Sequence, residues 1–323
     1  MHSSTSSSEP KLPFLASPGR ASAVLLAGAL LLLVAAEIGT HTFIYGLSNM
    51  LSRLRRESRE AVHLGPAAAL PPPVLLVGNS LLVAGVDVAA LDAALRPDHR
   101  VARFAIEQTT YYDWYFGLRR LMNEGSRPEA VVLCFQPRHL LDNGIHDEIF
   151  AHYNMQLRDI FLVSGTVGLS PTETSELFFA NVSEFWSLRR EVRKNLLGRL
   201  MPSFPSLAAM MTRSAPPPRP SLTELSDTGA PRMAALRQEV ERHGVRFVLA
   251  LMPPLQREEA EVMRKLGADN DVEVLAPVTD TDLQRSDYDP DGYHLSTPGR
   301  DKYTAALARD LGTALPGRTI PPR

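Results

Sequence analysis

Residues 74–80 read Val-Leu-Leu-Val-Gly-Asn-Ser, an apolar run that passes directly into a glycine, an asparagine and a serine. A continuous run of branched apolar residues before such a turn signal predicts a strand that is buried on both faces. The segment Val86–Leu95 that follows has the spacing of a helix. A buried strand followed by a helix is the repeating unit of a parallel sheet with helices on both sides.

The same alternation recurs along the chain. The predicted strands are Val74–Val77, Val101–Ile106, Ala130–Phe135, Val245–Leu251 and Val272–Leu275, and the predicted helices are Val86–Leu95, Tyr112–Asn123, Pro231–His243, Gln256–Leu266 and Pro298–Leu311. We therefore predict an α/β fold with a flavodoxin-like, doubly wound parallel sheet of about five strands. Ligands of such folds bind at the carboxyl ends of the strands.

The alternation stops within residues 138–220, where two helices are predicted, around Asp147–Val163 and Glu173–Leu200. We interpret this segment as a helical insertion that folds over the active-site edge. It could serve as a lid, dock a partner or act only as packing. The domain that contains it is expected to span residues 74–315.

The N-terminal part of the chain predicts a membrane anchor. Residues 1–20 are expected to be a disordered tail, 21–45 a transmembrane anchor, 46–73 a juxtamembrane helix and linker, and 316–323 a C-terminal tail. Ala21–Ala36 is apolar or small throughout, and with the residues up to Tyr45 it is long enough to cross a bilayer. A cleaved signal peptide and a buried soluble helix are the alternatives. Basic residues on both sides of the run leave its orientation open.

Composition excludes some classes of protein. With 44% hydrophobic and 22% charged residues, most of the chain is expected to fold. The net charge of −2 gives no electrostatic reason to expect a nucleic-acid partner. The single cysteine, Cys134, excludes an intramolecular disulfide, and its place in an apolar run predicts a buried structural thiol.

The first candidate for chemistry is Ser80. Gly78 permits a tight turn at the end of the first strand, and Asn79 and Ser80 follow at the reactive edge of the sheet. Backbone amides there can stabilise an oxyanion. The segment matches neither a P-loop nor G-x-S-x-G, because no Lys-Ser pair follows and Leu82 replaces the second glycine. Taken alone, the segment is more typical of a plain turn.

The second candidate lies near the C-terminus, where Asp291 precedes His294 by three residues and a helix is predicted to follow. A serine needs a base to remove its proton, and that base works best when a carboxylate orients it. Two alternatives remain for this loop: a chance histidine among solvated acids, or a calcium loop. Asp287, Asp289 and Asp291 open the calcium pattern, but its twelfth position is proline instead of glutamate.

Together the two segments resemble the SGNH, or GDSL-like, hydrolase superfamily. The first block of that family is matched by Gly78-Asn79-Ser80, and the last, Asp-x-x-His before a terminal helix, by Asp291 and His294. The resemblance covers residues 74–136 and 231–312. It implies that Ser80 is the nucleophile, that His294 is its base and that Asp291 orients the base, with no cofactor and no metal.

The second and third family blocks are missing. No glycine occurs in residues 106–110, and Gln136-Pro137-Arg138 stands where Gly-x-Asn-Asp is usual. Gln108 or Gln136 could supply a side-chain amide to the oxyanion, and Arg138 could hold an anionic group or a sugar. Each of the three could equally be a surface or packing residue.

In lacking these two blocks, the chain is similar to divergent, membrane-tethered members of the superfamily, which resemble the O-acetylation proteins of bacterial exopolysaccharides. That likeness implies a serine esterase or O-acyltransferase acting on acetyl groups of a cell-envelope or exported polysaccharide. It also implies a single-pass anchor, a periplasmic or otherwise extracytoplasmic domain, and a multi-pass membrane acyltransferase as partner. The alternative is a non-catalytic scaffold or polysaccharide-binding protein with the same fold.

Two weaker signals remain. The histidines at 139, 146 and 152 are spaced too irregularly to predict a metal site. The aromatic residues between Tyr111 and Phe116 are expected to pack in the core, with a sugar-stacking platform as the alternative.

Overall fold

The computed structural model describes residues 18–65, 71–145, 148–201 and 219–315. Five parallel strands form one sheet in the order β2-β1-β3-β4-β5. They are β1 (Pro73–Gly78), β2 (Arg100–Ala105), β3 (Ala130–Phe135), β4 (Arg246–Leu251) and β5 (Glu273–Leu275). The predicted doubly wound, flavodoxin-like α/β fold is confirmed, and each strand lies within one residue of its predicted bounds at both ends.

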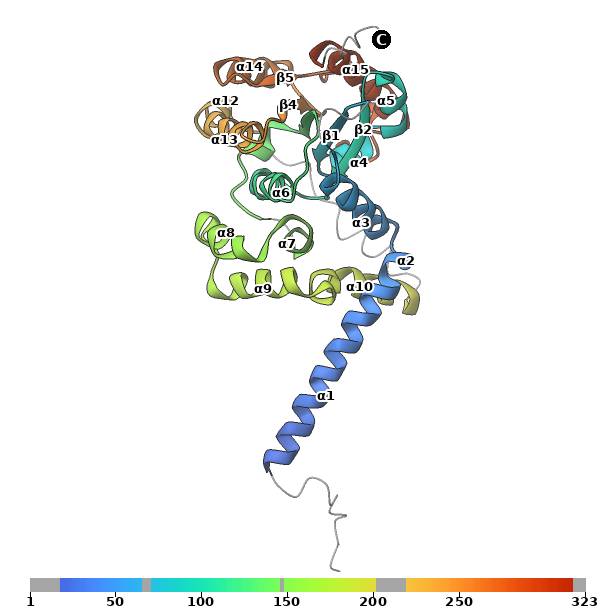
Figure 1. Ribbon diagram of the computed structural model, residues 1–323. Coiled ribbons are helices and arrows are strands. Elements are labelled where there is room, and N and C mark those ends of the chain that lie inside the picture. Colours follow the sequence, from blue (N-terminus) through green and yellow to red (C-terminus); the bar gives the residue numbers. More distant parts are fainter. Residues whose placement is uncertain (1–17, 66–70, 146–147, 202–218, 316–323) are drawn as a thin grey trace, which may run out of the picture.

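Helices cover both faces of the sheet (Figure 1). They are α3 (Asn49–Val62), α4 (Ser80–Gly85), α5 (Val88–Leu95), α6 (Tyr111–Asn123), α13 (Ala230–Glu241), α14 (Arg257–Asp269) and α15 (Thr297–Ala314). The short helix α4 was missed in the sequence, which predicted only the helix beginning at Val86. The chain is extended at Val86, and Asp87 then starts α5 by accepting hydrogen bonds from the amides of Ala89 and Ala90.

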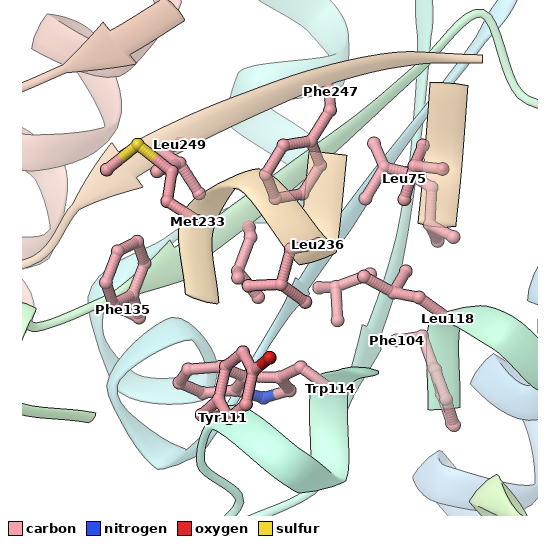
Figure 2. Close-up of a cluster of buried hydrophobic side chains, with 14 of the residues drawn as sticks. Leu75, Phe104, Tyr111, Trp114, Leu118, Phe135, Met233, Leu236, Phe247 and Leu249 are labelled. Carbon is pink, nitrogen blue, oxygen red and sulfur yellow. The ribbon is translucent and has the colours of Figure 1, made fainter. Parts of the chain in front are cut away.

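Alternate residues of each strand enter different cores. On one face Leu75, Phe104 and Phe247 pack with Trp114 of α6 and Leu236 of α13 (Figure 2). On the other face the core contains side chains of β1 and β3 together with α4, α5 and α15, including Leu76, Cys134, Tyr303 and Leu307. Cys134 is fully buried, as predicted, and burial raises the pKa of its thiol well above the ordinary value.

Helix α3 is part of the folded domain. Leu54 and Ala61 are fully buried in the same core as Leu75. Glu57 accepts hydrogen bonds from Arg53 and from Arg103 of β2. Residues 46–73 were expected to lie outside the domain, but the apolar face of α3 is covered by the sheet, so a fragment that starts after this helix would expose part of the core.

The described helices of the insertion contain more breaks than predicted and lie away from the active-site edge, although the first and last described residues of the insertion line the cavity at that edge. Its described elements are α7 (Glu148–Asn154), η4 (Leu157–Asp159), α8 (Ile160–Val167), α9 (Pro171–Val182) and α10 (Glu184–Leu200). Gly168 ends α8 in a left-handed conformation, and Ser183 caps α10, which splits the predicted helix Glu173–Leu200. These helices pack on Phe116 of α6 and beside the N-terminal helix, and so they do not cover the active-site edge.

The N-terminal helix α1 (Pro18–Gly39) continues through η2 (Thr40–Ile44) and α2 (Tyr45–Leu47) and projects away from the domain (Figure 1). Its 29 residues from Gly19 to Leu47 are long and apolar enough to cross a membrane. Ser48 ends it by adopting an extended conformation and capping α3. The predicted tails before residue 18 and after 315, the linker residues 66–70 and residues 202–218 of the insertion lie outside the described residues.

Candidate active site

Ser80 stands where β1 turns into α4. Asn79 caps α4 by accepting a hydrogen bond from the amide of Leu81 (3.1 Å), and its amide group donates to the carbonyl of Thr109 (3.0 Å). A Cβ on Gly78 would lie 2.6 Å from the carbonyl oxygen of Cys134, so only glycine fits between β1 and β3. These constraints present Ser80 as the first residue of the helix, where its amide has no intrahelical acceptor.

The loop before α15 brings Asp291 and His294 to Ser80. Nδ1 of His294 lies 2.7 Å from Oδ2 of Asp291, and Nε2 lies 3.0 Å from Oγ of Ser80. An ionised carboxylate can only accept a hydrogen bond, so the ring proton of His294 is on Nδ1 and the lone pair of Nε2 faces the serine hydroxyl. The structure therefore joins residues 214 positions apart into one hydrogen-bonded chain.

Asp291 is held in its ionised form. Partial burial raises the pKa of this carboxyl, but hydrogen bonds from the His294 ring and from the amides of Tyr293 and His294 outweigh it and lower the pKa below the ordinary value. The same two amide bonds close the turn between Asp291 and His294. The turn thus orients the carboxylate, and the carboxylate orients the ring.

The loop is attached to the domain through Asp287. This buried side chain accepts hydrogen bonds from the amide of Gln284 (2.7 Å) and from Nζ of Lys302 (2.7 Å). Its carbonyl accepts from the amide of Ser296, and a Cβ on Gly299 would lie 2.0 Å from that oxygen. Helix α15 can therefore begin directly beside the loop only because residue 299 is glycine.

The calcium interpretation of this loop finds no support. Asp287 is bound to Lys302 and Asp291 to His294, so two of the three predicted ligands are already occupied. Within the described part of the chain, no group of three or more His, Cys, Asp or Glu side chains could hold a metal ion. Of the three irregularly spaced histidines, His146 lies outside the described residues.

We expect Asp287→Asn to destabilise the protein by about 1–3 kcal/mol near pH 7, because charge-assisted hydrogen bonds are lost. The amide of Gln284 and the ammonium of Lys302 lower the pKa of Asp287 in the folded state. A lowered folded pKa contributes stability above the unfolded pKa and loses it as the pH falls through the folded one. The difference from wild type should therefore shrink below about pH 4.

Thermal unfolding of the detergent-solubilised chain from pH 7 to pH 3 measures this difference. Asp289→Asn is the control, since the exposed side chain of Asp289 makes no hydrogen bond to any described residue. A deficit in Asp287→Asn that stays constant over this pH range would contradict the assigned role.

A cavity of about 530 Å³ opens beside Ser80. Most of its lining residues are polar. They come from the segments after β1, β2 and β3, from the loop before α15, and from the end of the insertion and the residues just after it. The lining residues are Asn79, Ser80, Gln108, Thr109, Thr110, Arg138, His139, Leu141, Asp142, Arg219, Pro220, Glu224 and Tyr293. The cavity thus lies at the carboxyl edge of the sheet, where ligands of this fold class bind.

The backbone of Gln108 adopts a conformation that favours glycine. The residue is exposed at the cavity and its φ is 64°, in the left-handed region. The SGNH resemblance predicts a glycine in this loop. The turn is kept here without it, at a cost of about 1–2 kcal/mol of backbone strain.

Gln136 does not face the cavity. Its side chain is buried, its amide nitrogen donates to the carbonyl of Pro254 (2.8 Å), and its oxygen accepts from Arg138. Gln136 was predicted as an oxyanion donor, and this engagement removes it from that set. Its contacts instead hold the end of β3 against the loop after β4.

Arg138 lines the cavity with an uncompensated charge. Its guanidinium donates to Oε1 of Gln136 (3.3 Å) and to the hydroxyl of Tyr293 (3.1 Å), and both acceptors are neutral. No carboxylate of the described residues lies within ion-pair distance of it. A half-buried guanidinium of this kind is suited to an anionic or hydroxyl-rich ligand.

Tyr293 was not recognised in the sequence. The amide of Gln136 donates to Nδ1 of His139 (3.2 Å), which assigns the ring proton of the neutral imidazole to Nε2. Nε2 lies 3.3 Å from both the Arg138 guanidinium and the Tyr293 hydroxyl, and because the guanidinium can only donate, the Nε2 proton is directed to the hydroxyl. Arg138 donates to the same hydroxyl. The phenolic oxygen thus accepts two hydrogen bonds, and its own hydrogen is left for an acceptor in the cavity. Adjacency to His294 was the only sequence signal.

Among the aromatic residues after β2, Trp114 packs in the core beneath the loops that line the cavity. Trp114 is buried, packs edge-on against Phe135 and His139, and donates from its ring nitrogen to Oγ1 of Thr109 (3.0 Å). The expectation of core packing is thus met at Trp114. The bond to Thr109 also links the core to the loop that carries Gln108.

Known proteins offer a likeness in fold. No family model matches the sequence, and no curated protein matches it. The solved structure of TesA is similar over 75% of this chain and 99% of its own, with 13% identity and a TM-score of 0.39. A lipase/acylhydrolase from Enterococcus faecalis is similar over 77% of this chain and all of its own, with 14% identity and a TM-score of 0.34.

At these identities and TM-scores, the chemistry of the site has to be inferred from the side chains of this chain itself. The strand order, an early serine at the end of β1 and a late Asp-x-x-His before the last helix all have the arrangement that the SGNH resemblance implies. That resemblance is confirmed in the fold.

Proposed function

We propose that this protein is a membrane-anchored serine esterase or O-acyltransferase in which Ser80, His294 and Asp291 act as a catalytic triad. The observation that supports it is the hydrogen-bonded chain from the serine hydroxyl through the imidazole to an ionised carboxylate. This order of nucleophile, base and orienting group is the one that acyl transfer requires.

In the proposed reaction, Oγ of Ser80 attacks the carbonyl carbon of an ester while Nε2 of His294 takes the hydroxyl proton. The tetrahedral intermediate collapses, His294 returns the proton to the leaving alcohol, and the acyl group stays on Ser80. Water, or the hydroxyl of an acceptor sugar, then attacks the acyl-enzyme by the reverse path. Asp291 stabilises the imidazolium throughout.

The oxyanion would be held by as many as four donors. The amide of Ser80 is free of an intrahelical acceptor, and the left-handed turn at Gln108 supplies the amide that a glycine usually presents. The third is the Tyr293 hydroxyl: burial raises the pKa of this phenol, so it stays protonated, and donation by Arg138 and His139 to its oxygen leaves its hydrogen for the oxyanion. The side-chain amide of Gln108, exposed at the cavity, is the remaining donor that the sequence suggested.

The polar cavity supports a hydrophilic substrate. Arg138 and Arg219 line it together with Asp142 and Glu224, a set suited to sugar hydroxyls or charged groups. We propose acetyl esters on a cell-envelope or exported polysaccharide. The domain would then lie on the extracytoplasmic, periplasmic side, and a multi-pass membrane acyltransferase would be the donor or acceptor partner.

The test is ester turnover by the full chain in detergent, with p-nitrophenyl acetate and acetylated polysaccharide as substrates. We expect acetate release and covalent labelling of Ser80 by an organophosphonate. The alternative, a non-catalytic polysaccharide-binding protein, is favoured by the absence of the usual glycine and asparagine donors. Polysaccharide binding that survives Ser80→Ala and His294→Ala, with no turnover of either ester, would establish it.

We expect Tyr293→Phe to lower kcat on the order of 10- to 100-fold with little change in KM, because the lost hydroxyl acts on the intermediate and not on the bound ester. Steady-state kinetics with p-nitrophenyl acetate measures this split. Tyr288→Phe is the matched control, since the hydroxyl of Tyr288 is buried without a hydrogen-bond partner among the described residues. An unchanged kcat in Tyr293→Phe would remove the phenol from the oxyanion site.

A further inference from the structure

We propose that helices α9 and α10 lie flat on the membrane surface, with an apolar stripe of α9 inserted among anionic phospholipid headgroups. The stripe consists of Phe178, Phe179 and Val182, which are 42%, 48% and 52% exposed. This inference rests on α1 as a membrane anchor, but not on the proposed chemistry.

Glu37 sets the depth of the two helices relative to the anchor. It is the first charged residue after the apolar run of α1. Its carboxylate accepts hydrogen bonds from Oγ of Ser183 (2.7 Å) and from the amides of Glu184 (2.6 Å) and Phe185 (3.1 Å). The start of α10 is therefore fastened at the level where α1 passes from hydrocarbon to water.

The stripe points away from the domain. At about 100° per residue, Phe178, Phe179 and Val182 share one sector of α9, and the buried Leu177 and Ala180 point in the opposite direction. Leu177 and Ala180 belong to the core that α7 also enters. Because α9 and α10 form the outermost layer of the domain on the side from which α1 projects (Figure 1), the face opposite α7 is turned toward the membrane.

The charges fit a bilayer with anionic headgroups. Glu176, the exposed acid nearest to the stripe in the sequence of α9, is turned about 110° from its centre. Helix α10 carries five basic and two acidic residues. Of these, Arg193 and Arg199 are exposed and make no ion pair with any described residue. An apolar stripe on one helix and unpaired cations on the next form the pattern of helices that lie in the membrane interface.

The sequence makes a clean labelling experiment possible. Its one cysteine, Cys134, is fully buried, so an introduced exposed cysteine is the site that reacts. Phe178→Cys and Val182→Cys would carry an environment-sensitive fluorophore in the full chain, reconstituted into vesicles of phosphatidylcholine and phosphatidylglycerol without any other protein. Lipids with a nitroxide near the headgroup should quench both probes at least about twofold.

Three further positions serve as controls. Leu30→Cys, in the exposed apolar run of α1, should be quenched by lipids with a nitroxide deep in the acyl chain. Glu176→Cys, on the other side of α9, should be quenched less than the stripe. Arg257→Cys, on α14 at the far end of the domain, should not be quenched at all.

The outcomes separate the two proposals. If the probe at Leu30 is not quenched, the anchor fails and this inference fails with it. If Leu30 is quenched but Phe178 and Val182 remain as accessible to water as Arg257, the anchor stands and the membrane-surface proposal is overturned in favour of a protein partner on the stripe. Equal quenching in pure phosphatidylcholine would contradict the role assigned to Arg193 and Arg199.

Discussion

Replacing Ser80 with alanine is expected to lower kcat/KM for p-nitrophenyl acetate by a factor on the order of 10⁴ to 10⁶. The side chain of Ser80 is hydrogen-bonded to His294 and to no other described residue. Its removal therefore deletes the proposed nucleophile without breaking a bond that holds the fold. The cap of α4 remains, because Asn79 makes it.

The measurement needs the full chain, since α3 belongs to the domain core. Ser226→Ala is a suitable control because Ser226 is exposed and bonds only to the carbonyl of Leu222. Circular dichroism and thermal unfolding of both variants should match those of wild type. Undiminished turnover by Ser80→Ala would end the proposal of a serine nucleophile.

Asp291→Asn is expected to lower kcat by about 10² to 10⁴. An asparagine amide can donate to Nδ1 of His294, which would move the ring proton to Nε2 and turn the lone pair away from Ser80. The lowered pKa of Asp291 means that the wild-type carboxylate stays charged even somewhat below the ordinary pKa of an aspartate, so it is ionised wherever the enzyme is assayed near neutrality.

Asp289→Asn is the matched control for this substitution. It lies two residues away in the same loop, its side chain is exposed, and it would be a ligand if the loop bound calcium. We expect wild-type kinetics from Asp289→Asn with and without calcium. A fall in activity for Asp289→Asn as large as that for Asp291→Asn would show that the loop acts through its charge or a bound ion, and not through the orientation of His294.

Much of the fold could be predicted because its signals are local. Each strand is a continuous apolar run between turn residues, and its bounds came out within one residue. Breaks that depend on capping were harder. No proline or glycine marks the helix break at Ser183 in the sequence. The break is stabilised by Glu37, 146 residues earlier, which accepts hydrogen bonds from Ser183 and from the following amides.

In the candidate site, too, residues with a local sequence signal could be predicted, and residues whose role depends on distant partners could not. Ser80, Asp291 and His294 were found because two short patterns stand at the right ends of predicted elements. The orientation of Gln136 could not be predicted, because its side-chain amide donates to the carbonyl of Pro254, which is 118 residues away in the sequence. Tyr293 went unnoticed because its donors, Arg138 and His139, lie on another strand's end.

By itself, the sequence determined the parallel α/β sheet, the apolar N-terminal helix and the three residues of the proposed triad, because periodicity and turn chemistry act between near neighbours. Only the tertiary structure decided the orientation of Gln136 and the hydrogen-bond pattern around Tyr293. It also decided the course of α9 and α10 beside α1. Polar groups must find partners once they are buried, and in this protein those partners come from distant parts of the chain.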